Sequence, residues 1–500
     1  MNLSRRSFLA GAASISAAAW ASLRGERPNL RVGIVSDIHV SNDRPAALFE
    51  RALRYFDSRE VDAVLISGDL ITNGRRFEFE RMVGVWNKVF PGDRRSGGAR
   101  IEKLFITGNH DDDGWSYGRV KTAEEAKTCY YFNREKWWRE FFHEDYAPVR
   151  VREVRGYKFV LRHWVPRNVI TRFPDGSSLG PKPEDVVDRT AEFMAAQTLP
   201  TDRPFFYVQH EAPNDTVNAS WILKGRRWGP RDEGIATQLL SRYPNAIALS
   251  GHSHCSLTDE MSIWQGSFTA VNCSCLCGYC FTAPGRENGW SNDDFKNNPP
   301  PEMERFDIQS VNQGLVMEVF DDVIVFERHE FRHGHRLGPD WVVPIGKGAA
   351  RPYAPAARIA RTTAPQFPKD AKVTVWEGEG YGREKSGMER AKEKHAQIYV
   401  SFPAAREMDG SPSRGWDYRV KAELVVADTV MTLRERCVFS EGAFHAEEEE
   451  TDPVVCAFNR NDVPMALNPR AIVRFTAYPR NCWGQEGKGI SVEWRPKAAK

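Results

Sequence analysis

Leu104-Phe105-Ile106-Thr107-Gly108-Asn109-His110-Asp111 places a polar cluster directly after an apolar run. The apolar run predicts a buried strand. Asn109, His110 and Asp111 would then follow the carboxyl end of that strand, which is where ligands collect in an α/β sheet. This stretch therefore predicts an α/β fold with a polar site at the strand ends.

Four more segments repeat this pattern along the chain. Polar residues follow apolar runs at residues 31–35, 63–67, 205–209 and 247–250, and helical stretches are expected near residues 45–56, 77–89 and 185–196. The polar segments are Asp37-Ile38-His39, Gly68-Asp69, His210 and Gly251-His252-Ser253-His254. Alternating strands and helices predict sheets buried between helices, with all five segments at one set of strand ends.

The five segments contain five histidines, three aspartates and an asparagine. This set can hold two divalent cations side by side. Paired cations can lower the pKa of a bridging water and neutralise charge on phosphoryl oxygens, so the pattern indicates hydrolysis of a phosphate ester. Asp69 is the natural bridging carboxylate, because Gly68 allows a tight turn that presents it.

The five blocks, in this order, resemble the calcineurin-like metallophosphoesterases over about residues 30 to 335. The resemblance implies a four-layer α/β/β/α sandwich, with a catalytic domain expected at residues 30–337. It also implies hydrolysis of a phosphate mono- or diester by a hydroxide that bridges two metals. His110 is expected to act as general acid or charge stabiliser, with Asp111 fixing its tautomer. One metal is expected on Asp37, His39, Asp69 and His254, and the other on Asp69, Asn109, His210 and His252.

The expected ligands are oxygen and nitrogen atoms, which suit Mn²⁺, Fe²⁺ or Zn²⁺. Leu70-Ile71-Thr72 follows the Gly-Asp block, where purple acid phosphatases have a tyrosine ligand, so a ferric-tyrosinate site is not supported. Cys255 is the one soft group expected near the site, and we interpret it as a neighbour rather than a ligand.

Residues 1–21 resemble a twin-arginine export signal. Ser4-Arg5-Arg6-Ser7-Phe8-Leu9 precedes an Ala-rich apolar stretch, and Ala19-Trp20-Ala21 matches a small-x-small cleavage site. The alternative is a short buried or membrane helix, but the stretch is shorter than the roughly 20 residues that span a bilayer. The signal predicts a periplasmic or secreted protein, with no later transmembrane segment.

Cys273-Ser274-Cys275-Leu276-Cys277-Gly278-Tyr279-Cys280 concentrates thiols after a strand expected at residues 268–271. Such a run could form a disulfide or a soft-metal site. Alternating cysteines on a strand point to opposite faces, however, so buried thiols that pack as small apolar side chains are the favoured interpretation.

Three further segments carry open alternatives. Residues 115–148 are rich in aromatics and residues 282–308 in Asn, Asp and Pro, so each is either a functional lid or a satellite packing cluster. The segment from Arg328 to Arg336 contains His329, His333 and His335. We interpret it as a basic surface segment near the cleft rather than another metal site.

Composition changes after residue 337. Residues 338–368 are expected to connect to an accessory domain at residues 369–500, because Gly346 to Pro368 is rich in Ala, Arg, Gly and Pro. Short alternating runs at residues 373–376, 398–402, 418–425 and 471–477 predict an all-β sandwich that loosely resembles fibronectin-type or immunoglobulin-like modules. A glycan or envelope polymer is an expected ligand of this domain.

Two other functions remain open. The chain could bind an envelope polymer or glycan and carry a vestigial phosphoesterase fold, although the intact His110 and Asp111 speak against decay of the site. It could also be a nuclease, but 69 basic and 67 acidic residues give a formal charge of only +2, which predicts no general attraction to nucleic acid. The physiological ester is not predictable from these motifs.

Overall fold

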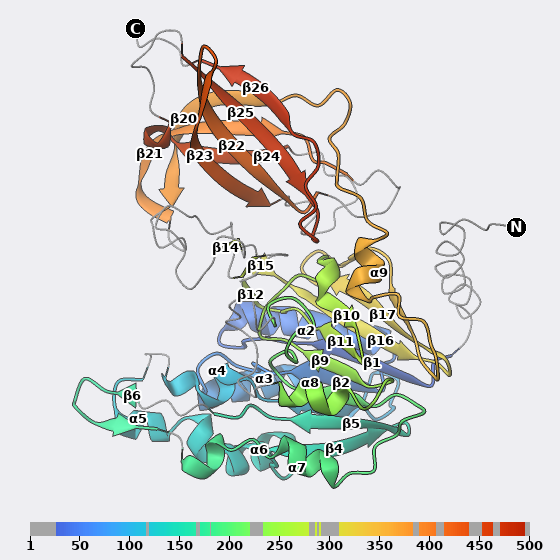
Figure 1. The fold of residues 1–500 in the computed structure, drawn as a ribbon. Coiled ribbons are helices and arrows are strands. Elements are labelled where there is room, and N and C mark those ends of the chain that lie inside the picture. The colour runs from blue at the N-terminus through green and yellow to red at the C-terminus, as the bar shows by residue number, and fades with distance from the viewer. Residues whose placement is uncertain are drawn as a thin grey trace, which may run out of the picture. The chain divides into compact units, whose positions relative to one another are not determined.

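The computed structural model describes residues 27–116, 120–166, 171–180, 182–220, 234–279, 286–287, 290–291, 310–383, 390–406, 415–439, 453–463 and 471–495. The chain divides into two compact units (Figure 1). Unit 1 holds the described residues of Met1–Leu257, Ser262–Cys280 and Ser310–Ala357. Unit 2 holds those of Thr258–Met261, Phe281–Gln309 and Arg358–Lys500.

Unit 1 is built on two sheets, and the first has seven strands in the order β18-β17-β16-β1-β2-β3, with β19 pairing to β17. β1, β2 and β3 run parallel, and β16 pairs antiparallel to β1. All five residues of β2 are buried, as expected for a parallel strand covered on both faces. The strands are β1 Leu30–Val35, β2 Ala63–Ser67, β3 Glu102–Ile106, β16 Gln313–Val319, β17 Val323–Glu330, β18 His335–Arg336 and β19 Trp341–Pro344.

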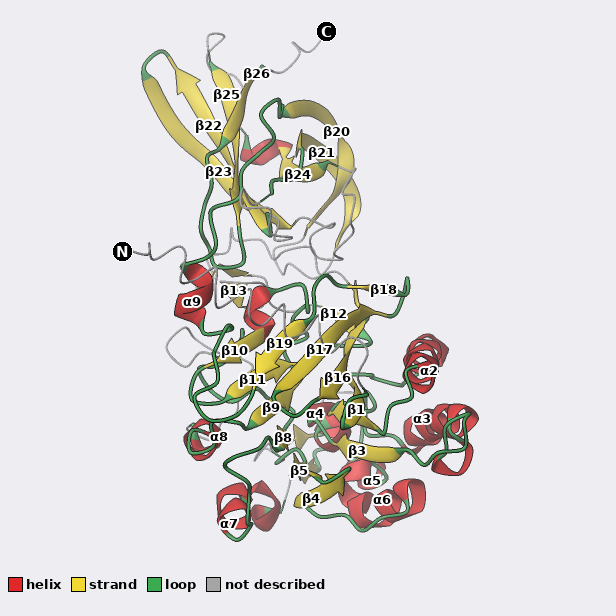
Figure 2. Ribbon diagram, turned by 90° about the vertical axis from the view of Figure 1, so that its right-hand side faces the viewer, coloured by secondary structure: helices red, strands yellow, loops and turns green. Residues whose placement is uncertain are grey.

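Helices α2 (Asp43–Ser58), α3 (Arg76–Val89) and α6 (Arg134–Phe142) pack against this sheet. Their apolar side chains form one cluster with Val64 and Ile66 of β2. α2 begins where the Asn42 side chain accepts a hydrogen bond from the amide of Arg44, which satisfies one free N–H group of the first turn. Figure 2 shows these helices on one side of unit 1, with α7 and α8 on the other.

The second sheet has six strands in the order β10-β11-β9-β8-β5-β4, of which β11, β9, β8 and β5 run parallel. α7 (Thr190–Ala195) and α8 (Ile235–Leu240) share a buried cluster with it. The predicted α/β fold is therefore confirmed. The strands are β4 Val149–Val154, β5 Tyr157–Arg162, β8 Phe206–Val208, β9 Ile247–Ser250, β10 Ile263–Gln265 and β11 Thr269–Asn272.

Aromatic side chains of residues 115–148 are mostly packed inside unit 1. Tyr130, Trp137 and Trp138 join the main core, while Trp115 and Tyr131 form a separate cluster around α5 (Ala123–Lys127). The packing interpretation accounts for these five side chains. Most of the other expected loop, residues 282–308, lies outside the described residues; the described part is a short pair of strands, β13 Arg286–Glu287 and β14 Trp290–Ser291.

Unit 2 is strand-rich. A three-stranded sheet (β20-β21-β24) and a four-stranded sheet (β23-β22-β25-β26) are both antiparallel, and their buried side chains form one cluster that includes Val400, Tyr418 and Phe475. α9 (Pro355–Ile359) lies within the expected linker. The strands are β20 Thr374–Arg383, β21 Arg390–Phe402, β22 Asp417–Val426, β23 Thr429–Phe439, β24 Val454–Asn459, β25 Ile472–Arg480 and β26 Ile490–Trp494.

In the part of the chain that the structure describes, no helix has both the length and the apolar character needed to cross a membrane.

Candidate metal centre

The seven expected metal ligands lie at the carboxyl ends of strands from both sheets of unit 1. Asp37 follows β1, Asp69 follows β2 and Asn109 follows β3 in the first sheet, while His210 follows β8 and His252 follows β9 in the second. Loops at this edge can direct side chains into one crevice, because the parallel strands all end there. The structure brings together Asp37, His39, Asp69, Asn109, His210, His252 and His254.

Asp37, His39, Asp69 and His254 form one group, in which one potential ligand atom of each lies within 4.8 Å of the others. Nε2 of His254 lies 2.9 Å from Oδ1 of Asp37. Nε2 of His39 lies 3.7 Å from Oδ2 of Asp69. Two carboxylates and two imidazoles therefore converge at spacings that a single divalent cation can span.

Asp69, His210 and His252 form the second group under the same 4.8 Å criterion. Nε2 of His210 lies 3.3 Å from Oδ2 of Asp69 and 3.1 Å from Oδ1 of Asn109. Nδ1 of His252 lies 3.2 Å from the same His210 nitrogen. Asp69 belongs to both groups, which is the position of a bridging ligand.

The proton of His210 is placed by the backbone. Its Nδ1 lies 2.8 Å from the carbonyl oxygen of Ser67, which can only accept a hydrogen bond. Nδ1 therefore carries a proton, and Nε2 is the ring atom that faces the centre of the site and would bind a cation in place of a second proton. Metal-binding histidines commonly have their second nitrogen fixed in this way.

The charges of the site also favour the binding of cations. Asp37 and Asp69 are buried, and among the described residues neither has a Lys or Arg partner. Burial opposes their charge, but the surrounding histidines lower the pKa of Asp37 and hold that of Asp69 well below its usual range. Burial likewise disfavours charge on His210, whereas Asp69 and Asp37 raise its pKa to about 10. Buried carboxylates that have histidines but no Lys or Arg as partners are typical of metal sites.

The backbone around the ligands is unusual. Asp37, His39, Asp69, His252 and His254 all have φ between 45° and 65°, which is the left-handed region that non-glycine residues rarely adopt. Each such residue costs of order 1–3 kcal/mol, and such conformations cluster at functional sites. The tight turns aim these side chains back toward the sheet edge.

Glycines in the motifs make room for the ligands. A Cβ on Gly251 would lie 1.8 Å from Oγ of Ser36 and 2.3 Å from Oδ2 of Asp37. Gly68 has φ +107°, and a Cβ there would lie 2.2 Å from Nδ1 of His210. The glycine before His252 and the one before Asp69 are therefore required by close packing at the centre.

His110 and Asp111 differ in part from prediction. The ring of His110 lies beside that of His39, with centroids 4.7 Å apart, so it borders the site as expected. Its Nδ1, however, lies 2.8 Å from the carbonyl oxygen of Thr72. Asp111 instead accepts hydrogen bonds from the backbone amides of Leu70, Ile71 and Gly108. The Thr72 carbonyl thus fixes the tautomer of His110, and Asp111 ties together the loops after β2 and β3.

The motif analysis missed Trp164 and Asp113. Trp164 lies two residues beyond β5, and its ring centroid is 6.0 Å from those of both His210 and His252. Its Nε1 donates to Oδ2 of Asp113 at 2.6 Å. The available sequence signals were the second acidic residue after Asp111 and an aromatic residue beyond an unpredicted strand.

Thiols surround the site more closely than predicted. Cys255 is buried, but Cys273 and Cys275 are buried as well. Sγ of Cys275 lies 3.5 Å from the carbonyl oxygen of Asp37, so Cys255 is not the one soft group near the site. Cys273 and Cys275 follow β11 rather than lying on it, and burial raises the pKa of both thiols. Their burial agrees with the packing interpretation; Cys280 lies outside the described residues.

The interpretation of residues 328–336 as a surface segment is wrong for its first part. His329 lies in β17, is buried, and stacks on Tyr55 with ring centroids 4.1 Å apart. Arg328 is also buried, and its Nη1 donates to the carbonyl oxygen of Leu257. The second part of the segment is accessible: Arg332, His333 and Arg336 are exposed, and His335 is partly exposed. β17 extends to Glu330, and this places His329 in the sheet.

Residues 30–256 match the model of the calcineurin-like phosphoesterase family. The chain thus contains a domain of the calcineurin-like metallophosphoesterase family, and the family supports a phosphate-ester hydrolase. A comparison with curated protein sequences gives no match.

Several solved structures resemble the chain at low identity. A dimetal phosphatase from Danio rerio is 12% identical, with a TM-score of 0.36, over 64% of this chain and 100% of that one. Purple acid phosphatase PPD1 from yellow lupin (Lupinus luteus) seeds is 11% identical, with a TM-score of 0.39, over 63% of this chain and 55% of that one. The GAP50 anchor of the inner membrane complex of Plasmodium is 11% identical, with a TM-score of 0.34, over 63% of this chain and 88% of that one.

Proposed function

We propose that this protein hydrolyses a phosphate mono- or diester at a centre that holds two divalent cations. The observation that carries the proposal is the convergence of six candidate ligand side chains around the buried carboxylate of Asp69. The family match of residues 30–256 supports the same reaction class. A bridging carboxylate between two ligand groups is what paired-cation chemistry requires.

Asp37, His39, Asp69 and His254 would hold one cation, and Asp69, Asn109, His210 and His252 the other. When bound, such cations activate water and neutralise charge on the phosphoryl oxygens. The donor set has oxygen and nitrogen atoms only, which suits Mn²⁺, Fe²⁺ or Zn²⁺. The geometry of His210, with its Nδ1 proton held by the Ser67 carbonyl, leaves Nε2 to bind a cation in place of a second proton.

His110 is positioned to assist the leaving group. Its backbone N–H donates to Oδ1 of Asp69 at 2.8 Å, which fixes the residue beside the expected bridge. Because Nδ1 is held by the Thr72 carbonyl, Nε2 is the ring atom left to deliver a proton to the departing oxygen. The residue is only partly buried, so an ester can approach it from solvent.

The test is the Asp69→Asn variant, assayed with nitrophenyl phosphate and bis-nitrophenyl phosphate. Turnover should fall by more than the roughly 10–100-fold seen when a residue that only supports a metal ligand is lost. Activity of the chelated wild-type enzyme should return with Mn²⁺. Asp62→Asn is the matched control, because Asp62 lies immediately before the opposite end of β2. Unchanged hydrolysis by Asp69→Asn would contradict the proposal.

Export, domain roles and partners belong to the same proposal. The signal-like sequence of residues 1–21, which lies outside the described residues, supports transport to the periplasm or beyond by the twin-arginine route. The paired sheets of unit 1 support the four-layer α/β/β/α order, and the shared core of two antiparallel sheets supports a β-sandwich in unit 2. A glycan or envelope polymer is the ligand we propose for that sandwich.

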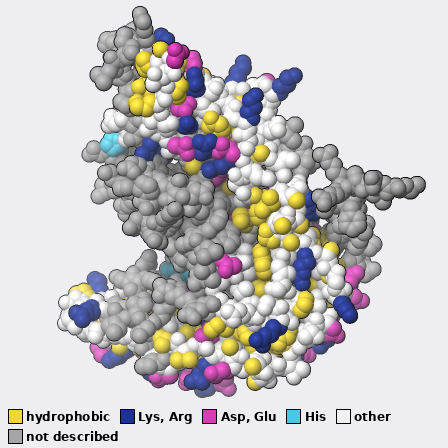
Figure 3. All heavy atoms as spheres, viewed as in Figure 1, with side chains coloured by type: hydrophobic (Ala, Val, Ile, Leu, Met, Phe, Trp, Pro, Cys, Tyr) yellow, Lys and Arg dark blue, Asp and Glu magenta, His cyan; other side chains and the backbone are white. Residues whose placement is uncertain are grey.

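The alternative functions predict different assay results. A vestigial enzyme would be inactive on every ester of a broad panel and would still bind polymer. A nuclease would cleave DNA or RNA in preference to small esters. Figure 3 shows Lys and Arg side chains interspersed with Asp and Glu over the described part of the face in view, which does not favour binding along a nucleic-acid backbone.

A further inference from the structure

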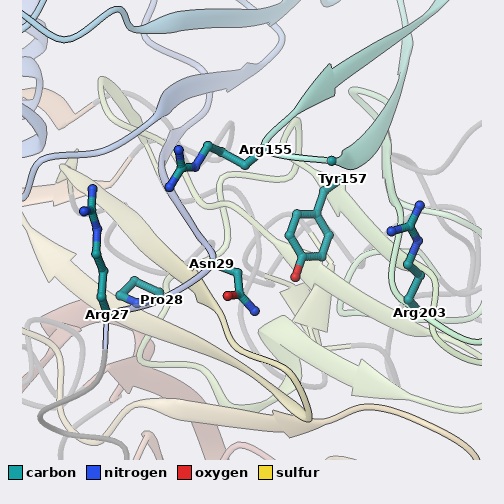
Figure 4. A pocket seen from close by; sticks show the side chains of 7 residues that line it. Arg27, Pro28, Asn29, Arg155, Tyr157 and Arg203 are labelled. Atoms are coloured by element: carbon teal, nitrogen blue, oxygen red, sulfur yellow. The ribbon is translucent and has the colours of Figure 1, made fainter.

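A second concave site lies in unit 1, away from the metal centre. Its cavity has a volume of about 610 Å³ and is lined by Arg27, Pro28 and Asn29 before β1, by Arg155 and Tyr157 at the start of β5, and by Arg203 before β8. Figure 4 shows the side chains of these residues from close by. Cavities of roughly 300–1,000 Å³ accommodate small organic ligands.

This cavity is at the opposite end of the strands from the candidate metal centre. β1 begins at Leu30 beside the cavity and ends at Val35, two residues before Asp37. β5 begins at Tyr157, which lines the cavity, and ends at Arg162, two residues before Trp164. At about 3.3 Å per residue, the two sites lie roughly 20 Å apart along either strand. A small ester bound at the metal centre therefore does not reach the cavity.

The charge around the cavity is unbalanced. Among the described residues, neither Arg27 nor Arg203 forms an ion pair with a carboxylate, whereas Arg155 pairs with Asp62 at 3.8 Å. Asn29 directs its amide toward Asp321. Some other exposed arginines of unit 1 are paired, for example Arg139 with Asp145. Arg27 and Arg203 thus place two positive charges beside this hollow that no described carboxylate neutralises in an ion pair, and these charges attract an anionic ligand.

The chemistry of the lining defines the ligand class. Guanidinium groups present forked donors that match tetrahedral oxyanions, and they are favoured for recognition of phosphate and related groups. The ring of Tyr157 and the ring of Pro28 provide apolar surface beside the charges. The volume is far larger than one oxyanion needs. We infer that this cavity binds an organic polyanion that carries several clustered phosphate or sulfate groups.

The test uses the metal-loaded, full-length protein and two probes, inositol hexasulfate and inositol hexakisphosphate, in isothermal titration calorimetry. The Arg155→Gln/Arg203→Gln variant should bind at least one probe ten or more times more weakly than the wild type. If only one of the two probes binds, that probe identifies whether the cavity prefers phosphate or sulfate groups. Turnover of nitrophenyl phosphate should be unchanged, because neither arginine belongs to the metal centre.

Two controls separate this site from other causes of binding. Arg139→Gln/Arg189→Gln removes the same charge from two exposed arginines that each have an acidic neighbour, and should weaken binding less than twofold. Asp69→Asn should leave probe binding intact. The inference fails if the wild type binds neither probe, if both double variants lose equal affinity, or if binding disappears in Asp69→Asn, which would place the probe at the metal centre.

Discussion

At the scale of single residues, the sequence predicts which side chains gather at the site but not the backbone conformation that positions them. The motifs supply seven candidate ligand residues, and the structure places these seven side chains in one cluster. The left-handed backbone angles of five of them could not be predicted, because the chain accepts that strain only once the surrounding turns are packed. The error over Asp111 has the same origin: a carboxylate beside a histidine in sequence need not face its ring.

Gly251→Ala should damage the metal centre. The added Cβ would overlap Oγ of Ser36 and Oδ2 of Asp37, so the Asp37 carboxylate must move away from His254. We expect loss of bound metal by elemental analysis and loss of esterase activity. Gly84→Ala is the matched control. Gly84 lies within α3 with open space around it, so that variant should keep its metal and gain roughly 0.5–1 kcal/mol of stability. Full metal occupancy in Gly251→Ala would refute the steric argument.

His329 should make unit 1 less stable in mild acid. Burial lowers the pKa of His329 from 6.5 to about 4. Between these values the unfolded chain takes up a proton that the folded chain does not, so the free energy of unfolding falls as pH drops from about 6.5 to about 4. The full effect is at most roughly 3 kcal/mol. His329→Phe should flatten this part of the stability profile measured by urea unfolding. His333→Phe, at an exposed position, should not; equal slopes in both variants would exclude His329 as the source.

At the scale of elements, strong apolar runs were predictable and weakly patterned ones were not. β1, β2, β3 and β9 match the runs found in sequence. The β4–β5 hairpin was missed, because Arg150 and Arg152 interrupt its apolar residues and a long aromatic segment precedes it. The helix expected at residues 185–196 is shorter than predicted: Pro183–Val186 forms a 3₁₀ turn, and α7 begins at Thr190.

Asp111 accepts hydrogen bonds from backbone N–H groups of the loops after β2 and β3, and this leads to a distinct prediction. Asp111→Asn replaces one acceptor oxygen with an amide that faces backbone N–H groups of the loops after β2 and β3. Misplacement of Asp69 and Asn109 should weaken metal affinity about 10–100-fold. Excess Mn²⁺ should restore most of the turnover, and the pH–rate profile should keep its shape. A displaced limb of that profile would indicate that Asp111 acts on His110 after all.

At the scale of the whole molecule, the change of composition after residue 337 predicts a second folding unit, and a separate strand-rich unit is present. The substrate and the arginine-lined cavity were not predictable. Arg27, Arg155 and Arg203 are far apart in sequence and carry no motif, and only the ends of β1, β5 and β8 bring them to one hollow.

The two units should unfold separately, because each has its own buried cluster. Ile398→Ala should lower the free energy of unfolding of unit 2 by about 2–5 kcal/mol, which lowers the midpoint temperature of one calorimetric transition. The variant should keep its esterase activity. Ile66→Ala in unit 1 should lower the other transition and reduce activity. Both side chains are fully buried, so the pair is matched in size and environment. A single transition that shifts in both variants would show that the units unfold together.

β1 cannot complete its strand pairing until β16, which lies far along the chain, has been synthesised. β1 pairs with β2 on one side, but on the other its neighbour is β16, with Leu30 opposite Val319. During synthesis at about 5–20 residues per second, roughly 15–60 s pass before that edge can close. Until the ribosome has delivered residue 319, the nascent polypeptide exposes the side of β1 that β16 will cover. A chaperone that binds extended apolar segments would find its target there.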